Sequence, residues 1–130
     1  MRTDSNPSGE HDPQGYALIG ACFEVYNELG NGYLEDVYQE SLELELQERG
    51  IPFVSQPKLP ILYKQRRLRK QYEADLLVFD RIIVELKAVR VLAPEHEAQL
   101  LHYLKSTGHR VGYIINFGAA PKLEWLRRVR

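Results

Sequence analysis

The stretch Ile82-Ile83-Val84-Glu85-Leu86-Lys87-Ala88-Val89 decides the fold of this chain. It is almost continuously apolar, which is typical of a strand in the middle of a sheet with both faces buried. Side chains alternate between the two faces of a strand, so Glu85 and Lys87 lie on the same face. Charges inside a sheet are costly unless they are paired or bind a metal. The stretch therefore predicts a central strand that carries either a buried ion pair or a functional site.

A helix and a second buried strand follow this central strand. Pro94 suits the first turn of a helix and Gly108 suits the position just after its end, so we expect a helix over residues 94–107. Residues 110–117 form another nearly continuous apolar run. Strand, helix and strand in this order predict a right-handed crossover between two parallel strands.

The segments on either side complete a mixed sheet flanked by helices. Apolar residues recur every three or four positions over residues 16–29 and 34–46, as on one face of a helix. Residues 59–63 and 68–79 are rich in β-favouring residues, and the short basic turn between them predicts a hairpin. We expect this hairpin to join the same sheet and residues 121–130 to add a last edge strand. The predicted class is α/β, with the order α-α-β-β-β-α-β-β.

Length and composition indicate one soluble domain. The chain has 130 residues, of which 44% are hydrophobic and 27% charged, a balance that excludes a disordered chain. Residues 1–13 are polar and lack an apolar period, so we expect a mobile tail there and a single domain over residues 14–130. No apolar run approaches the roughly 20 residues of a membrane span, and we expect no secretory signal. Cys22 is the only cysteine. We therefore expect a cytoplasmic protein.

The charge is divided unevenly along the chain. Residues 14–57 carry eight acids and one base, whereas residues 58–130 carry seven acids and fifteen bases. The basic part either binds nucleic acid or neutralises the charge of the acidic part within the folded protein. Its densest segment could follow a nucleic-acid backbone, although charges on an exposed hairpin also prevent edge-to-edge aggregation. These bases are Lys64, Arg66, Arg67, Arg69 and Lys70.

Asp75 is a further polar residue at a position where the pattern favours an apolar one. It stands in the predicted strand that precedes Glu85 and Lys87. Two carboxylates from adjacent strands form an oxygen site suited to Mg²⁺, which takes one or two carboxylates from a protein and keeps several waters. A lysine beside such a site can orient or deprotonate a water, or stabilise charge on a phosphate. The alternative is a Glu85–Lys87 ion pair without a catalytic role.

Asp75, Glu85 and Lys87 together resemble the motif of the PD-(D/E)xK nuclease superfamily, in which an acid is followed by an acid, one spacer and a lysine. The proline of the motif is absent, since Ala74 precedes Asp75. Further positions resemble a small bacterial branch of that superfamily, the GxxExxY proteins. They are Gly32-Tyr33-Leu34-Glu35-Asp36-Val37-Tyr38, Gln99 with Tyr103, and Ile115-Asn116-Phe117-Gly118, so that the resemblance covers residues 16–130.

The resemblance implies a restriction-endonuclease-like fold and hydrolysis of phosphodiester bonds in DNA or RNA. It implies Mg²⁺ as the cofactor, with Mn²⁺ as a substitute. On the matching positions, Asp75, Glu85 and the backbone carbonyl of Leu86 would bind the metal, and Lys87 would position or activate the attacking water. Helical spacing places Glu35 on the inward face of its helix, and the resemblance gives it a direct or water-mediated metal role.

Gln99 and Tyr103 lie one turn apart on the predicted third helix. The resemblance implies that they support the site, whereas their spacing alone fits the rim of the core equally well. The alternative function is a catalytically silent module of the same fold that binds nucleic acid or a protein. DNA and RNA, and endo- and exonucleolytic cleavage, all stay open. A homodimer would suit cleavage of both strands of a duplex.

Overall fold

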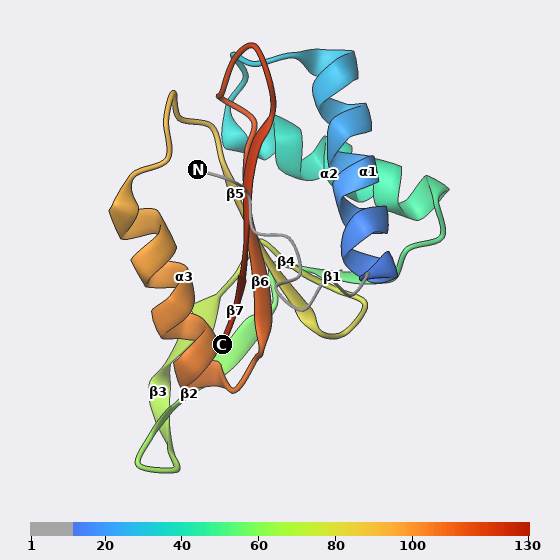
Figure 1. Cartoon of the computed structure of the whole chain (residues 1–130). Coiled ribbons are helices and arrows are strands. Elements are labelled where there is room, and N and C mark those ends of the chain that lie inside the picture. The colour runs from blue at the N-terminus through green and yellow to red at the C-terminus, as the bar shows by residue number, and fades with distance from the viewer. Residues whose placement is uncertain (1–11) are drawn as a thin grey trace.

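A central five-stranded sheet with helices on both faces organises residues 12–130, the part of the chain that the computed structural model describes (Figure 1). The strands lie in the order β1-β4-β5-β6-β7. Strands β5 and β6 are parallel, and the other neighbours are antiparallel. The predicted α/β class and the parallel crossover are therefore confirmed. The strand bounds are β1 Phe53–Ser55, β4 Leu76–Val78, β5 Ile82–Lys87, β6 Val111–Asn116 and β7 Glu124–Val129.

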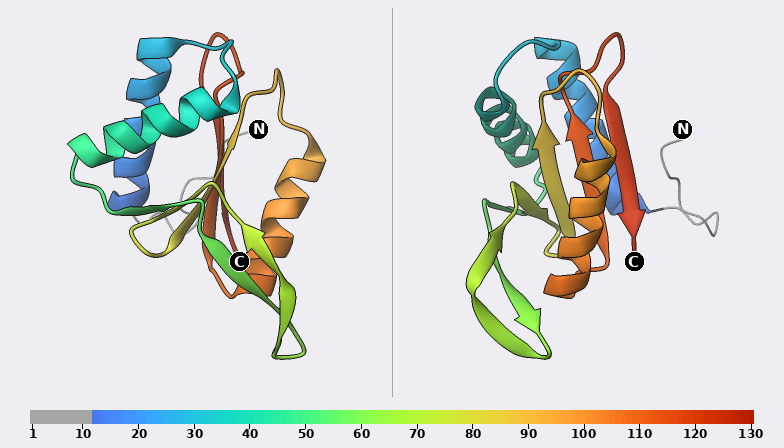
Figure 2. Two further views of the ribbon diagram at one scale, coloured as in Figure 1. Left: turned by 180° about the vertical axis from the view of Figure 1, so that it is seen from behind. Right: turned by 90° about the vertical axis from the view of Figure 1, so that its left-hand side faces the viewer.

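The predicted helices are present. Helices α1 (Pro13–Leu29) and α2 (Glu35–Glu48) cover one face of the sheet, and α3 (Pro94–Thr107) covers the other (Figures 1 and 2). Helix α1 begins inside the predicted tail because Asp12 caps it by accepting the Gly15 amide at 3.2 Å. Residues 1–11 of that tail lie outside the described residues. None of these three helices has the length and apolar character needed to cross a membrane.

The alternation along β5 divides the core into two layers. Ile82, Val84 and Leu86 pack in the layer beneath α1 and α2. Ile83 faces the opposite way and joins the layer beneath α3, which includes Leu100. Glu85 and Lys87 stand on this second face, beyond the end of its apolar layer, and both are half-buried. The face of the sheet that lies under α3 is thus apolar around Ile83 and charged at the end of β5.

The hairpin of β2 (Lys58–Tyr63) and β3 (Arg66–Glu73) does not join the central sheet, contrary to the prediction. It forms a separate two-stranded sheet that projects from the body (Figure 2). All residues from 62 to 71 are exposed, so this part of the hairpin does not pack against the central sheet. The antiparallel neighbour of β5 is β4 instead, and β4 pairs on its other side with the short strand β1, which the sequence did not predict.

The predicted long strand over residues 68–79 is interrupted at Ala74 and Asp75. Strand β3 ends before them and β4 begins after them. Ala74 is fully buried in the layer under α3, and the chain bends at Asp75. The interruption places Asp75 at the junction between the projecting hairpin and the central sheet.

Candidate active site

Asp75 is held against the backbone of β5. Its Oδ2 accepts a hydrogen bond from the backbone amide of Leu86 at 2.6 Å. Its own backbone carbonyl accepts hydrogen bonds from the Gln39 side chain and the Gln56 amide, both at 2.9 Å. Because Leu86 stands between Glu85 and Lys87, the carboxylate of Asp75 is fixed beside the Glu-x-Lys segment. The bend before β4 therefore brings Asp75 next to the segment of β5 that carries Glu85 and Lys87.

Burial raises the pKa of Asp75 above its ordinary value. The Leu86 amide and the Lys87 ammonium lower this pKa, whereas the charges of Glu35 and Glu73 raise it. Negative charge thus accumulates around a carboxylate that is largely withdrawn from water. This balance favours the binding of a cation at Asp75.

Burial also raises the pKa of Glu85, to about 7. The Lys87 ammonium lowers this pKa and Glu35 raises it. Within residues 12–130 the Glu85 carboxylate accepts no hydrogen bond. A half-buried carboxylate that accepts no hydrogen bond and lies within reach of the Glu35 charge suits a hard cation.

The donor set fits a partly hydrated metal ion rather than a closed cage. The described residues contain no group of three or more histidine, cysteine, aspartate or glutamate side chains arranged to hold a metal. Mg²⁺ is commonly bound by one or two carboxylates together with water. Asp75 and Glu85 offer carboxylate oxygens of the kind that this mode of binding uses.

Glu85 makes the stability of the metal-free protein depend on pH. The unfolded chain releases this proton near pH 4.5, whereas the folded protein keeps it to about pH 7. Stability therefore falls as the pH rises through this interval, because the unfolded state ionises first. Glutamine does not ionise, so we expect Glu85→Gln to remove this pH-dependent loss of stability. At pH 8 its midpoint of thermal unfolding should exceed that of the wild type by about 5 °C or more.

The measurement is thermal unfolding in chelator at pH 5 and pH 8. The difference between Glu85→Gln and the wild type should be much smaller at pH 5. Glu40→Gln, at an exposed position of α2, controls for the loss of one negative charge. Equal unfolding midpoints for Glu85→Gln and the wild type at pH 8 would contradict the raised pKa.

Glu35 does not face the core, contrary to the expectation from helical spacing. It is exposed, whereas Tyr38, one turn further along α2, is completely buried. Glu35 is the first residue of α2, and it precedes Tyr38, the first residue of this helix that is buried in the core. Its charge nevertheless raises the pKa of both Asp75 and Glu85, which places it at the edge of the same site.

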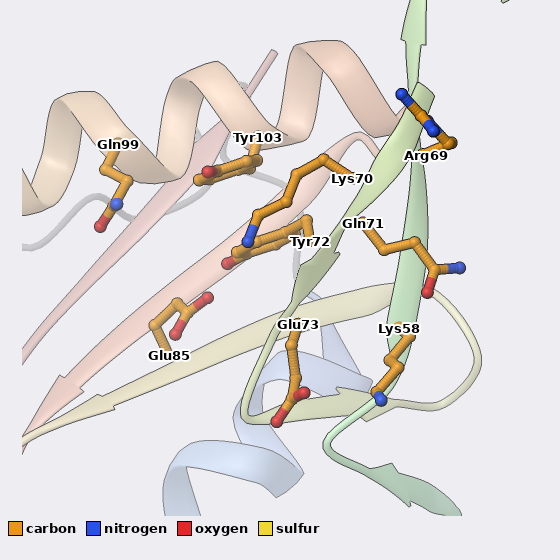
Figure 3. Close-up of a pocket in the computed structure, with 9 residues that line it drawn as sticks. All are labelled: Lys58, Arg69, Lys70, Gln71, Tyr72, Glu73, Glu85, Gln99 and Tyr103. Carbon is orange, nitrogen blue, oxygen red and sulfur yellow. The ribbon is translucent and has the colours of Figure 1, made fainter. Parts of the chain in front are cut away.

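A pocket of about 500 Å³ opens beside Glu85, between the hairpin and α3 (Figure 3). Gln99 and Tyr103 line it from α3, so the structure brings both predicted supporting residues to the side of Glu85. Of the five predicted nucleic-acid contacts, Arg69 and Lys70 line the pocket, and the other three are exposed nearer the projecting end of the hairpin. The lining residues are Lys58, Arg69, Lys70, Gln71, Tyr72, Glu73, Glu85, Gln99 and Tyr103.

Asn116 and Gly118 hold the segment that follows Lys87, a role that the sequence did not reveal. Asn116 is fully buried, and its Oδ1 accepts hydrogen bonds from the amides of Val89 at 3.0 Å and Gly118 at 3.1 Å. Its Nδ2 donates to Glu124 at 2.9 Å. The amide of Phe117 donates to the carbonyl of Lys87 at 2.8 Å. These bonds fix the end of the strand that carries the charged pair.

Tyr38, the last residue of the Gly-x-x-Glu-x-x-Tyr motif, is a structural residue. Its hydroxyl donates to the carbonyl of Gly30 at 2.5 Å and accepts from the amide of Tyr33 at 3.3 Å. Its ring stacks on Phe117, with centroids 4.5 Å apart. Gly32 in the same loop has φ 117°, which favours glycine. The motif therefore shapes the turn that delivers Glu35 to the site.

The fold and this cluster of charges define a nuclease-like domain, and the comparisons agree. The sequence matches the PD-(D/E)XK nuclease superfamily over residues 12–129. The chain belongs to this superfamily.

Among solved structures, the fold is similar to the crystal structure of SSO0001, with a TM-score of 0.56 and 17% identity. The similarity covers 73% of this chain and 49% of that one, so this chain spans about half the length of that protein. At this identity the likeness concerns the fold. None of the curated proteins matches the chain.

Proposed function

We propose that this protein is a divalent-metal-dependent nuclease that hydrolyses phosphodiester bonds in DNA or RNA. The observation that carries the proposal is that the Asp75 carboxylate accepts a hydrogen bond from the Leu86 amide, between Glu85 and Lys87, next to a pocket lined by Glu85 and by a basic hairpin. Superfamily membership supports nuclease chemistry. The match to the Gly-x-x-Glu-x-x-Tyr pattern further supports a place in the GxxExxY branch.

Asp75, Glu85 and the backbone carbonyl of Leu86 would hold Mg²⁺, with Mn²⁺ as a substitute. Glu35, at the exposed edge, would act through a water. When bound, the ion supplies Lewis acidity for the phosphate and lowers the pKa of a nearby water. The raised pKa values of Asp75 and Glu85 support this assignment, because a carboxylate whose ionised form is disfavoured by burial and by the Glu35 charge gains most from a neighbouring positive charge.

Lys87 would position the attacking water and stabilise the negative charge that develops on the phosphate. It is half-buried on the same face as Glu85 and makes no ion pair closer than 4.0 Å within residues 12–130. Its ammonium is thus available to substrate. Gln99 and Tyr103 would donate hydrogen bonds to the substrate from the opposite wall of the pocket.

The hairpin would bind the nucleic-acid backbone. Its basic side chains are exposed and project from the body, and such contacts give affinity without sequence preference. The substrate is therefore the polyanion itself rather than a particular base sequence. These side chains are Lys64, Arg66, Arg67, Arg69 and Lys70.

Calorimetric titration of Mn²⁺ and Mg²⁺ tests the metal site without assuming a substrate. We expect saturable binding to the wild type that Asp75→Asn loses, because the amide removes one of the two carboxylates. Asp80→Asn, at an exposed turn, is the matched control and should bind as the wild type does. The same three proteins are then incubated with single- and double-stranded DNA and RNA.

Cleavage that requires the metal and fails in Asp75→Asn supports the proposal. Binding of nucleic acid without cleavage, unchanged by Asp75→Asn, would contradict it and indicate a silent binding module. Cleavage by Asp75→Asn at the wild-type rate would also contradict the assignment of the site.

A further inference from the structure

The hairpin forms most of the wall of the pocket beside Glu85. Lys58 of β2 and the consecutive residues 69–73 of β3 line it, whereas only Glu85, Gln99 and Tyr103 come from the rest of the fold (Figure 3). The hairpin shares no strand pairing with the central sheet. Its position over the site therefore depends on its base, where the Ala74 amide donates to the Pro57 carbonyl at 3.2 Å and where buried side chains pack beneath α3.

One aromatic stack joins this hairpin to α3. The rings of Tyr72 and Tyr103 have centroids 3.9 Å apart and planes 3° apart. Tyr72 is only 8% exposed, although the neighbouring residues Gln71 and Glu73 are exposed. Aromatic pairs stabilise a structure beyond the area that they bury. The stack therefore orients the base of the hairpin relative to the helix that carries Gln99.

Lys70 is the cation that the hairpin directs towards the carboxylates. Alternate residues of a strand share a face, so Lys70 lies on the side of Tyr72 and Arg69 on the other. Figure 3 shows the Lys70 side chain running towards the Tyr72 ring and ending at it, on the side of the pocket where Glu85 lies, whereas Arg69 points away. Lys70 makes no ion pair closer than 4.0 Å within the described part of the chain. Its ammonium is available to an anion next to the site.

The chemistry of this wall suits a phosphate. Lys70 offers a positive charge, and the tyrosine hydroxyls and glutamine side chains on the same pocket offer neutral donors. A nucleic-acid strand carries a phosphate at every nucleotide, so a strand with one phosphate at Asp75 and Glu85 presents its neighbour close by. We propose that Lys70 binds the phosphate adjacent to the scissile one, and that the Tyr72–Tyr103 stack positions Lys70 for this contact.

This assignment rests on the proposed nuclease function and separates Lys70 from the other bases of the hairpin. Lys64 lies in the turn at the far end, where its ammonium stands 5.5 Å from the centroid of the Tyr63 ring. A contact there adds affinity but does not align the scissile bond. A contact at Lys70 aligns it, because it fixes the phosphate next to the one that reacts at Asp75 and Glu85.

The experiment measures kcat and KM separately on an oligonucleotide that the wild type cleaves. Lys70→Ala should lower kcat between roughly 10- and 100-fold at saturating substrate, because the bound strand then no longer aligns its scissile bond with the site. Lys64→Ala is the matched control and should act mainly on KM. Both lysines are exposed, so neither change threatens the fold.

A double-mutant cycle tests the positioning role of Tyr72. Tyr72→Leu removes the stack and should lower kcat as Lys70→Ala does, and the double variant should be no slower than Lys70→Ala alone. Tyr72→Phe keeps the ring and should recover most of the kcat that Tyr72→Leu loses. Thermal unfolding of each variant accompanies the assay. Additive losses, or a failure of Tyr72→Phe to recover, would overturn the positioning role.

A change in KM alone for Lys70→Ala, equal to that of Lys64→Ala, would overturn the assignment of Lys70 while the nuclease function stands. If the wild type cleaves nothing, the proposed function fails. The phosphate contact of Lys70 is then tested by the affinity for a labelled single-stranded DNA oligonucleotide, measured by fluorescence anisotropy. Non-additive loss of affinity for Tyr72→Leu and Lys70→Ala would then support the contact, and additive loss would overturn it.

Discussion

Lys87→Ala is expected to lower metal-dependent cleavage on the order of 10³-fold, the range that mutagenesis gives for one proton-transferring or charge-stabilising group. The variant should bind Mn²⁺ as the wild type does, because Asp75 and Glu85 remain. The expected signature is therefore a loss of kcat with metal affinity retained. Single-turnover cleavage and calorimetric titration measure the two quantities.

The effect of Lys87 on its neighbours requires a control. Its ammonium lowers the pKa of both Asp75 and Glu85, so the alanine variant raises both pKa values and could lose activity through protonation alone. Cleavage is therefore measured at pH 7 and pH 9. Recovery of the wild-type rate at pH 9 would contradict a direct role for Lys87. Lys122→Ala, at an exposed position, controls for the loss of one positive charge.

Gly118→Ala is expected to lower the free energy of unfolding by about 3 kcal/mol or more, the upper range for an overpacked site. A Cβ at Gly118 would meet the backbone of the segment after Lys87, at 2.5 Å from the Val89 nitrogen and 2.6 Å from the Ala88 carbonyl carbon, and would also meet the Val89 oxygen. Backbone atoms cannot rotate away as side chains do. The end of β5 must move, and urea unfolding measures the cost.

Gly20→Ala is the matched control for the Gly118 prediction. A Cβ at Gly20 would meet only the end of the flexible Arg49 side chain, at 3.3 Å. Alanine is better than glycine inside a helix, so this variant should be as stable as the wild type or more so, by up to roughly 1 kcal/mol. A Gly118→Ala protein as stable as Gly20→Ala would contradict the close approach of the two segments.

The central strand and the crossover were predictable because they depend on local patterns. A continuous apolar run, a proline at the start of a helix and a glycine at its end are read directly from neighbouring residues. The same run made Glu85 and Lys87 conspicuous, since charges are rare among buried positions. The class of the protein could therefore be expected before the structure was known.

The place of the hairpin was predicted wrongly because alternating polar and apolar residues indicate a strand but not the strand with which it pairs. Residues 59–63 and 68–79 do contain β-structure, but Ala74 and Asp75 interrupt the second run. Pairing with the central sheet went to β4 and to β1, whose length of three residues leaves almost no periodic signal. Glu35 was similarly misplaced because helical spacing does not reveal where packing begins.

The sequence by itself determined the class of the protein, the two parallel strands and the candidate site residues, because each follows from local apolar patterns and the polar residues that interrupt them. Only the tertiary structure decided that the hairpin stands over the site, that Tyr72 meets Tyr103, and that Asn116 and Gly118 hold the segment after Lys87. These contacts join residues far apart in the chain. Their geometry depends on how the packed layers close on one another, which no local pattern encodes.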